Sequence, residues 1–312
     1  MKVIVTGGTG MIGTAVVNRL LERGYQVMVF TRKKGLPADT EKALSYHYWN
    51  VDAGEIDREA VLTADAIIHL AGAGVMDRPW SAKRKNVIVN SRVQSGQLLA
   101  DTLLSAPNRL KVLVSAAATG WYGADPEVPN PAPFTEAWPA APDFLGACCR
   151  KWEESTEDLV QIGIRVVHLR TGIVLGPGGG VLAALKQALK WRLAVIPGNG
   201  RQVISWIHLD DLVSLYQAAM EQAVYKGSLN AVAPYPVSNA QLVQTLAVAR
   251  YGTAFMTIHI PAVALKWTLG ERGSEALKSC TVSAQQLLAC GFEFRYPDIQ
   301  AAARALMTAS GF

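Results

Sequence analysis

The sequence predicts an α/β fold in which a doubly wound parallel sheet carries a smaller C-terminal α/β lobe. Short β-branched runs alternate with amphipathic helical stretches through the first half of the chain, the pattern of parallel strands joined by crossover helices. A glycine-rich loop directly follows the first of these runs. The 312 residues are enough for one large domain with an attached lobe.

The elements of the first domain are predicted in chain order. A strand at residues 2–6 precedes a helix at 11–23, which stops at Gly24. Further strands are expected at 26–30, 66–70, 111–115 and 165–169, and further helices at 91–104 and 153–161. These elements predict a sheet of six or seven strands. We assign residues 1–175 to this domain and expect 205–232 to return to it.

The pattern loosens after the Gly-Pro-Gly-Gly-Gly stretch at 176–180. A helix is expected at 182–189, a turn at 197–200, and short helical stretches after Asn239 and Ser283. We assign residues 176–204 and 233–312 to the smaller, substrate-side lobe.

Composition excludes several classes of protein. Half of the residues are hydrophobic and 18% are charged, which excludes a disordered chain. The longest apolar runs fall short of the roughly 20 residues of a membrane span, and the N-terminus lacks signal-peptide features, so we expect a cytoplasmic protein. The net charge is +5, but basic residues form only two short runs, at 32–34 and 83–85. We expect no nucleic-acid partner and no membrane partner.

The four cysteines include the adjacent pair Cys148 and Cys149 and lack the paired spacing of a zinc site. Reduced structural thiols are the default interpretation. The five histidines also lack metal-ligand spacing, so no metal is expected.

The stretch Thr6-Gly7-Gly8-Thr9-Gly10-Met11-Ile12-Gly13 lies where a Rossmann-type dinucleotide loop must lie, after the first strand and at the start of the first helix. Gly7 permits the turn, Gly10 lets backbone approach a pyrophosphate, and Gly13 lets the helix pack on the strand. The helix N-terminus adds free N–H groups and a positive dipole. The alternative is a purely structural glycine turn.

The end of the second strand selects the nucleotide. A carboxylate there would bind the ribose 2′-hydroxyl, but the sequence reads Thr31-Arg32-Lys33-Lys34. Arg32 lies nineteen positions after Gly13 and can hold a 2′-phosphate with two parallel hydrogen bonds, so the sequence predicts NADP. The alternative is a basic surface turn.

Two other stretches fit the same site. Small residues at 70–73 would let the cofactor lie against the sheet edge, and Asp52 is either an adenine ligand or a turn residue.

Four stretches together resemble the extended short-chain dehydrogenases, the nucleotide-sugar epimerase and dehydratase superfamily: residues 7–13, 70–72, 115–123 and 206–211. The stretches at 118–123, 169–176, 198–211 and 290–294 resemble more narrowly its "epimerase family protein" branch, and the likeness covers nearly the whole chain. The resemblance implies NADP contacts at Thr31, Arg32, Leu70, Ala71, Arg92 and Val174. The full set of expected cofactor-binding residues is Gly7, Thr9, Gly10, Met11, Ile12, Gly13, Thr31, Arg32, Leu70, Ala71, Gly72, Arg92 and Val174.

Catalysis in this superfamily uses a tyrosine four residues before a lysine, whose ammonium lowers the pKa of the phenol. None of the nine tyrosines has that lysine, and at the expected place stand Phe144 with Cys148 or Leu145 with Cys149.

Three candidate catalytic residues are left. Ser115 or Thr119 could orient a carbonyl, and Tyr122 is the best phenol in the stretch. Without a nearby cation its pKa should stay near the ordinary value of about 10. The alternative is that Trp121 and Tyr122 pack the lobe interface.

Other polar residues are weaker candidates. Arg170 either holds substrate or anchors a loop. His208 with Asp210 and Asp211 resembles an acid-base cluster, but a helix start capped by Asp is the favoured interpretation. Arg201 and Trp206 could face the cleft.

Two functions are compatible with these features. One is an NADP-dependent oxidoreductase or epimerase acting on a small carbonyl or sugar-like substrate between the sheet edge and the second lobe. The other is an NADP-binding regulatory or sensor protein with little or no turnover, which the missing Tyr/Lys pair favours. A nucleic-acid binder ranks last. A homodimer through helices flanking the sheet is compatible with the superfamily.

Overall fold

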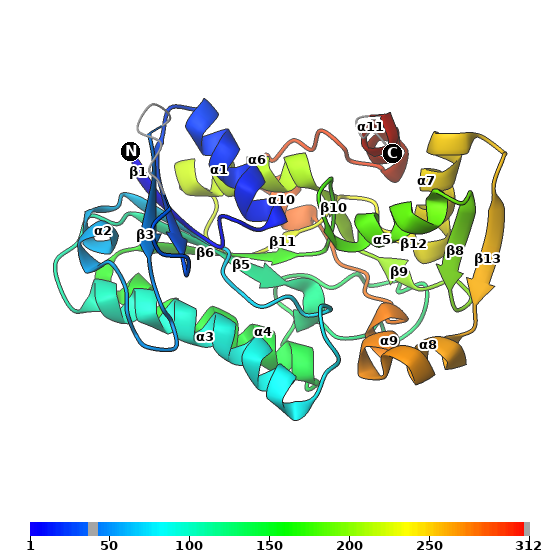
Figure 1. Ribbon diagram of the computed structural model, residues 1–312, viewed down its shortest axis with the longest axis horizontal. Helices are drawn as coiled ribbons and strands as arrows, with labels where there is room; N and C mark the ends of the chain where they lie inside the picture. Colours follow the sequence, from blue (N-terminus) through cyan, green and yellow to red (C-terminus); the bar gives the residue numbers. More distant parts are fainter. Residues whose placement is uncertain (37–42, 309–312) are drawn as a thin grey trace.

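A seven-stranded, all-parallel sheet forms the centre of the computed structural model, which describes residues 1–36 and 43–308 (Figure 1). Its strand order is β11-β6-β5-β4-β1-β2-β3. The strands are β1 (Lys2–Thr6), β2 (Gln26–Thr31), β3 (Leu44–Tyr48), β4 (Ala66–His69), β5 (Val112–Ala118), β6 (Arg165–Thr171) and β11 (Gly227–Ala231). The predicted fold class, a doubly wound parallel α/β sheet with an attached α/β lobe, is confirmed.

The chain reverses its direction of travel across the sheet at β1. Val5 pairs with Val29 of β2 on one side and with Ile68 of β4 on the other. The connections after β1 and β4 therefore diverge to opposite faces and leave a crevice between the carboxyl ends of these strands. Ile4 and Val5 are both fully buried, as expected for strands covered on both faces.

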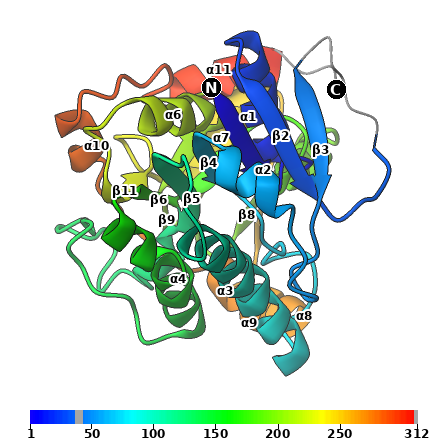
Figure 2. The same ribbon diagram turned by 90° about the vertical axis from the view of Figure 1, so that its left-hand side faces the viewer.

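Helices cover both faces of the sheet (Figures 1 and 2). One face carries α1 (Met11–Glu22) and α6 (Leu209–Glu221), and α10 (Gln285–Ala289) packs near the edge strand β11. The other face carries α2 (Arg58–Thr63), α3 (Ala82–Leu104), α4 (Phe144–Glu154) and the 3-10 helix η2 (Glu157–Ile162). The two faces bury separate apolar clusters, around Val5 and Leu212 on one side and around Ile4 and Leu99 on the other.

Two helices differ from the sequence-based expectation. Helix α3 begins at Ala82, nine residues before the expected start at residue 91, because the Ser81 side chain caps it by accepting from the Arg84 N–H. The prediction of one helix at 153–161 was wrong, because α4 ends at Glu154 and the 3-10 helix η2 follows it. Asp143 caps α4 by accepting from the Gly146 N–H at 2.8 Å. The helix ends before Ser155, whose hydroxyl donates back to Trp152 O and competes with helical hydrogen bonding.

The smaller lobe has its own apolar core, which contains Leu182, Trp206, Leu246 and Leu306. In the described residues the lobe contains two two-stranded sheets, β9–β12 and β8–β13. A third two-stranded sheet, β7–β10, lies in residues assigned to the first domain, at its border with the lobe. These strands are β7 (Ile173–Leu175), β8 (Leu193–Pro197), β9 (Val203–Ile204), β10 (Trp206–His208), β12 (Val237–Ser238) and β13 (Met256–Ile260). The remaining helices are α5 (Gly180–Leu189), α7 (Asn239–Tyr251), α8 (Ala262–Leu269), α9 (Glu271–Ala276), α11 (Ile299–Thr308) and the 3-10 helix η1 (Thr119–Trp121) after β5.

Hydrogen bonds tie the C-terminal part to the large sheet. The Asp125 carboxylate, in the loop after β5, accepts from the hydroxyls of Ser279 and Thr281 at 2.8 Å. At a second place the Asp211 carboxylate of α6 accepts from the backbone N–H groups of Arg295 and Tyr296. The loop after β5 therefore keeps a fixed position against the lobe.

A buried ion pair joins β6 to α4. The Arg170 guanidinium donates to both carboxylate oxygens of Glu153 at 2.8 and 2.9 Å, and both side chains are 4% exposed. The same guanidinium stacks 3.6 Å above the Trp121 ring. This buried pair has a structural role, because removing either partner would leave an unpaired buried charge and strongly destabilise the folded state.

No helix in residues 1–36 and 43–308 is long and apolar enough to cross a membrane.

Candidate functional site

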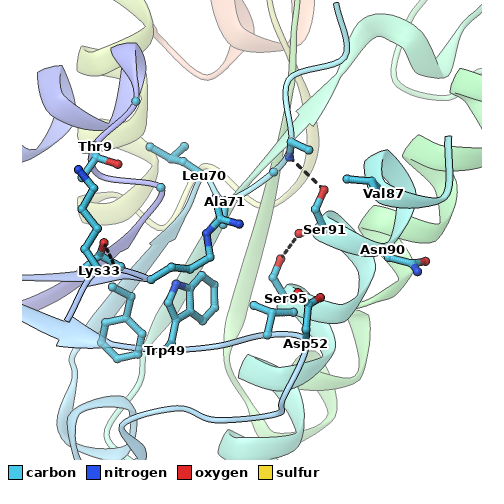
Figure 3. A pocket seen from close by; sticks show the side chains of 18 of the residues that line it. Thr9, Lys33, Trp49, Asp52, Leu70, Ala71, Val87, Asn90, Ser91 and Ser95 are labelled. Carbon is cyan, nitrogen blue, oxygen red and sulfur yellow. Dashed lines mark hydrogen bonds between the residues drawn. The ribbon is translucent and has the colours of Figure 1, made fainter. Parts of the chain in front are cut away.

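A cavity of about 880 Å³ lies at the carboxyl ends of β1, β2 and β4, in the crevice that the strand order creates (Figure 3). Polar and small side chains dominate its lining. The lining residues are Gly7, Thr9, Gly10, Phe30, Thr31, Arg32, Lys33, Trp49, Val51, Asp52, Leu70, Ala71, Gly72, Ala73, Lys83, Asn86, Val87, Asn90, Ser91 and Ser95.

The glycine loop forms one wall and shows why its glycines are needed. Gly7 has φ +67°, and a Cβ there would lie 2.7 Å from Leu70 O. A Cβ on Gly13 would lie 2.2 Å from Gly7 O, so that the helix could not pack on the loop. At Gly10 a Cβ would meet only Gly7 O, at 3.5 Å. The protein itself therefore tolerates a side chain at Gly10, and only a group in the cavity would require its absence.

The N-terminus of α1 opens into this cavity. Gly10 is the N-cap residue, and it offers no side chain to the free N–H groups of the first helical turn. No acidic residue stands in that turn. Free N–H groups at the positive end of a helix dipole are suited to binding an anion.

Basic side chains lie at the end of β2. Thr31, Arg32 and Lys33 all line the cavity, and Thr31 Oγ1 accepts from the Lys33 N–H at 3.2 Å. Figure 3 shows the Lys33 side chain extending toward Thr9. Lys34 is directed elsewhere, because its Nζ lies 4.4 Å above the ring of Tyr48. Two adjacent cations therefore border the cavity where a carboxylate would favour a 2′-hydroxyl.

The first half of α3 forms a wall that the sequence did not predict. Lys83, Asn86 and Asn90 lie at helical spacing and line the cavity, followed by Ser91 and Ser95. Sequence periodicity missed them because they are polar residues facing a cavity rather than apolar residues facing a core. The available signal was Ser81, a favoured N-cap residue directly before this stretch.

A buried histidine fixes the floor of the cavity. His69 is fully buried, its Nδ1 lies 2.7 Å from Thr6 Oγ1, and its Nε2 lies 3.1 Å from Ser95 Oγ. Thr6 Oγ1 in turn accepts from the N–H groups of Leu70 and Ala71 at 3.1 and 3.2 Å. Because these two hydrogen bonds occupy both lone pairs of the hydroxyl oxygen, its proton goes to His69 Nδ1. The network holds the segment after β4 against the glycine loop.

Arg92 lies behind this segment rather than in the lining of the cavity. Its guanidinium carbon would be 3.2 Å from a Cβ on Gly72, and its Nη1 donates to Ala73 O at 3.0 Å. The guanidinium stacks 4.7 Å from the Trp152 ring. The structure thus gives Arg92 a role in positioning residues 72–73, and its direct contact with a cofactor stays a prediction.

Four other expected cofactor residues also lie outside the cavity lining: Met11, Ile12, Gly13 and Val174. Met11 contacts the second glycine-rich stretch, where a Cβ on Gly179 would lie 3.6 Å from its Sδ. Val174 lies in β7, paired with Ile207. The 176–180 loop therefore borders the N-terminus of α1, a proximity that its sequence does not indicate.

The three candidate catalytic residues lie along the end of β5, outside the cavity lining. Ser115 is fully buried, and its hydroxyl donates to Ala116 O at 3.1 Å. Thr119 is partly exposed and makes only a long hydrogen bond, 3.5 Å, to Thr171 O. Of the two hydroxyls, that of Thr119 is the more accessible to a substrate.

Tyr122 is held inside a polar network. Its hydroxyl donates to Asn230 Oδ1 at 2.6 Å and accepts from Arg170 Nη1 at 3.0 Å. Burial raises the pKa of Tyr122 to about 12, although the neighbouring Arg170 opposes the effect. The expectation of an ordinary pKa was wrong because the side chain is only 5% exposed, and the raising effect of burial exceeds the lowering effect of Arg170. The geometry favours the alternative in which Tyr122 packs the lobe interface.

The position of the missing Tyr/Lys pair is filled by apolar and thiol side chains of α4. Cys148 and Cys149 are free and buried, and burial raises the pKa of both thiols. Sγ of Cys149 would lie 3.7 Å from a Cβ on Gly120. Neither thiol is therefore poised as an acid or base at neutral pH.

The weaker candidates have structural roles. Arg170 pairs with Glu153 of α4 and anchors the loop before that helix by donating to Glu136 O. His208 caps α6 by accepting from the Asp210 N–H. Capping by histidine differs from the expected Asp cap. Trp206 is fully buried and does not face the cleft, whereas Arg201 is exposed.

In the part of the chain that the structure describes, no group of three or more His, Cys, Asp or Glu side chains is arranged to hold a metal ion.

Comparisons with known proteins agree with this geometry. Residues 3–231 match the NAD dependent epimerase/dehydratase family, and residues 260–306 match a domain of unknown function, DUF1731. The chain is 33% identical over 309 residues to the chloroplastic "Epimerase family protein SDR39U1 homolog" of Arabidopsis thaliana, covering 98% of this chain and 87% of that protein. It is 32% identical to "Epimerase family protein Mb2239" of Mycobacterium bovis, covering 95% and 94%.

Two solved structures are also similar. The human epimerase family protein SDR39U1 with NADPH superimposes with a TM-score of 0.85 at 28% identity, covering 99% of this chain and all of that one. A nucleoside-diphosphate sugar epimerase from Corynebacterium glutamicum gives 0.77 at 29% identity, covering 98% of this chain and 58% of that one.

The network around His69 predicts a pH dependence of stability. Burial, with a contribution from His168, lowers the pKa of His69 from 6.5 to about 4. The unfolded chain therefore binds a proton that the folded chain does not, and stability is lost as the pH falls from about 6.5 toward 4. We expect this loss to be on the order of 3 kcal/mol in urea denaturation, and His69→Gln to lack it. His259→Gln removes an exposed histidine and should keep the wild-type profile. Parallel profiles for wild type and His69→Gln would contradict the assignment.

Proposed function

The chain belongs to the NAD dependent epimerase/dehydratase family, and on that premise we propose that it binds NADP(H) in the cavity beside Gly7 and Gly10. We propose further that it uses the nucleotide for hydride transfer with a small carbonyl or sugar-like substrate. The proposal rests on one observation: the α1 N-terminus, which no side chain caps, borders the same cavity as Arg32 and Lys33. The solved structure of the human relative SDR39U1, which contains NADPH, supports it.

The residues present fit each part of this nucleotide. The free N–H groups after Gly10 suit the pyrophosphate, and the absence of a side chain at Gly10 leaves room for it. Arg32 and Lys33 would hold the 2′-phosphate, with the Thr31 hydroxyl beside them. Asp52 and Asn90 border the region left for the adenosine.

The nucleotide would supply the hydride, and the chain would position the substrate. Thr119 is the proposed orienting hydroxyl, because it is partly exposed and only weakly hydrogen-bonded at the end of β5. Arg92 fixes the segment after β4 by donating to Ala73 O. The smaller lobe would close the substrate side of the crevice.

A second candidate function is an NADP-binding regulatory protein without turnover. It is favoured by one specific set of contacts: the phenol of Tyr122 is engaged by Asn230 and Arg170, and thiols stand in place of the lysine. Both functions share the nucleotide site and differ only in the chemistry beside it.

Turnover separates the two functions. We expect NADPH absorbance to fall with at least one member of a panel of aldehydes, ketones and nucleotide sugars, and Thr119→Val to slow that reaction more than it weakens NADPH binding. Tight NADPH binding with no consumption across the panel would instead support the regulatory function.

The nucleotide preference can be tested at Arg32. We expect the wild-type chain to bind NADPH more tightly than NADH, and Arg32→Asp to lose about 100-fold in NADPH affinity with little change for NADH. Lys34→Asp makes the same change of charge two residues away, on a side chain that contacts Tyr48, and should retain the preference. Isothermal titration calorimetry of the wild type and both variants with NADPH and with NADH would give the dissociation constants to compare. Equal affinities of the wild type for the two nucleotides would refute the 2′-phosphate assignment.

Substitutions at Gly10 and Gly13 should have different effects, because Gly10 leaves room for the ligand whereas Gly13 is needed for packing of the protein itself. Gly10→Ala should change the free energy of unfolding by less than about 1 kcal/mol and weaken NADPH binding at least tenfold, because only the nucleotide needs that space. Gly13→Ala should destabilise the folded chain itself, since its Cβ would overlap Gly7 O. Urea denaturation and NADPH titration of both variants provide the measurement. Undiminished binding by Gly10→Ala would place the pyrophosphate elsewhere.

A further inference from the structure

Charge is distributed very unevenly along the chain. Residues 176–209 and 222–270, which include most of the smaller lobe, contain no Asp or Glu. The same stretches contain seven cations: Lys186, Lys190, Arg192, Arg201, Lys226, Arg250 and Lys266. The chain as a whole has 30 basic and 25 acidic residues, so this part of it is far more basic than the average.

Large apolar side chains are exposed on the same part of the lobe. Trp191 is 79% exposed, Met256 67%, Val263 78% and Trp267 88%. None of the residues of α8 is buried, and among the described residues β13 pairs only with β8. We call this region, Trp191 with β13 and α8, the terminal face. Exposed apolar side chains gathered in this way are typical of an interaction surface.

The terminal face lies far from the nucleotide cavity. Figure 1 places β8, β13 and α8 at the right-hand end of the molecule, opposite β3 and α2. No residue of the smaller lobe lines the cavity. A partner on the terminal face would therefore leave the cavity open.

Cations lie next to both exposed tryptophans in the sequence of this face. Lys190 and Arg192 flank Trp191, and Arg192 has φ +56°, so that the chain turns sharply there. Lys266 precedes Trp267 on α8. Lys190, Arg192 and Lys266 are all exposed.

We infer that the terminal face docks on the surface of an anionic phospholipid bilayer. Tryptophan and aliphatic side chains insert at the level of the lipid headgroups, while the surrounding lysines and arginines are attracted to anionic phosphates. The inference goes beyond the proposed nucleotide function and does not depend on it. It replaces the sequence-based expectation of no membrane partner, which rested on the lack of a spanning segment.

Other occupants fit the terminal face less well. A symmetric pair of copies would bring together two faces that carry cations and no carboxylate, so the face is not complementary to itself. A nucleic acid would use the cations and stack on the tryptophans but would leave Met256 and Val263 without a partner. Charge complementarity together with aliphatic exposure therefore points to an anionic bilayer.

Vesicle binding by the full chain tests the inference. The probes are vesicles of phosphatidylcholine alone and of an equimolar mixture with phosphatidylglycerol, and the measurement is sedimentation of the protein with the vesicles. We expect binding to the mixed vesicles, weakened by added salt, and no binding to phosphatidylcholine alone. Brominated acyl chains should quench part of the tryptophan fluorescence of the bound protein.

Matched variants distinguish insertion of the terminal-face tryptophans into the bilayer from attraction by the positive charge of the whole protein. Trp191→Ser with Trp267→Ser should lower binding about tenfold or more and abolish the additional quenching, whereas Tyr235→Ser, an exposed aromatic outside the terminal face, should not. Lys190→Glu with Lys266→Glu should lower binding at least as much. Arg23→Glu with Lys111→Glu gives the same net charge from exposed positions elsewhere and should retain most of it.

Three results would overturn the inference. They are no binding of the wild type to mixed vesicles at low salt, an equal loss of binding in the two charge variants, and a dimer in analytical ultracentrifugation that the tryptophan substitutions abolish. The last result would assign the terminal face to a second copy. Circular dichroism and NADPH titration of each variant would confirm that its fold is retained.

Discussion

The close contact between the glycine loop and the end of β4 is the constraint on which the rest of the structure depends. Gly7 lies so near Leu70 O that a Cβ would stand 2.7 Å from it, and Thr6 Oγ1 accepts from the next two backbone N–H groups. This contact brings together two chain segments more than sixty residues apart and places the N-terminus of α1 over the crevice. His69, buried and uncharged beneath it, completes the network without introducing a charge below an anion site.

The nucleotide site and the chemistry beside it are built in different ways. The nucleotide site combines backbone N–H groups with the exposed side chains of Arg32 and Lys33, which need no exact partner within the protein to present positive charge. The region beside it is a closed network, in which Arg170, Glu153, Tyr122 and Asn230 satisfy one another. Disturbing one member would leave a buried polar group unpaired, so this region is resistant to change whereas the nucleotide site can respond to a ligand.

Sequence reasoning predicted the parts of the molecule that local patterns encode. The glycine loop and the five strands predicted at 2–6, 26–30, 66–70, 111–115 and 165–169 were found because period, turn residues and spacing are local properties, whereas no range was predicted for β3, β11 or the strands of the smaller lobe. The first turns of α3 were missed because Lys83, Asn86 and Asn90 face a cavity, which removes the apolar stripe that marks a helix. The partner of Arg170 could not be found either, since many carboxylates are available and only the packing of α4 on β6 selects Glu153. The contact of the 176–180 glycine loop with Met11 could not be found for the same reason.

The buried network also narrows the choice of a proton donor. A phenol that donates to Asn230 and accepts from Arg170 must break both hydrogen bonds before it can reach a substrate, and its pKa near 12 makes it a weak acid at neutral pH. The thiols of α4 are buried, and their raised pKa values oppose ionisation. Ser115 is sealed within the sheet. Of Ser115, Thr119, Tyr122 and the two thiols, Thr119 alone combines partial exposure with a weak internal hydrogen bond. A hydroxyl of this kind orients a carbonyl but is a poor acid, so any proton that accompanies hydride transfer would come from water or from the substrate itself.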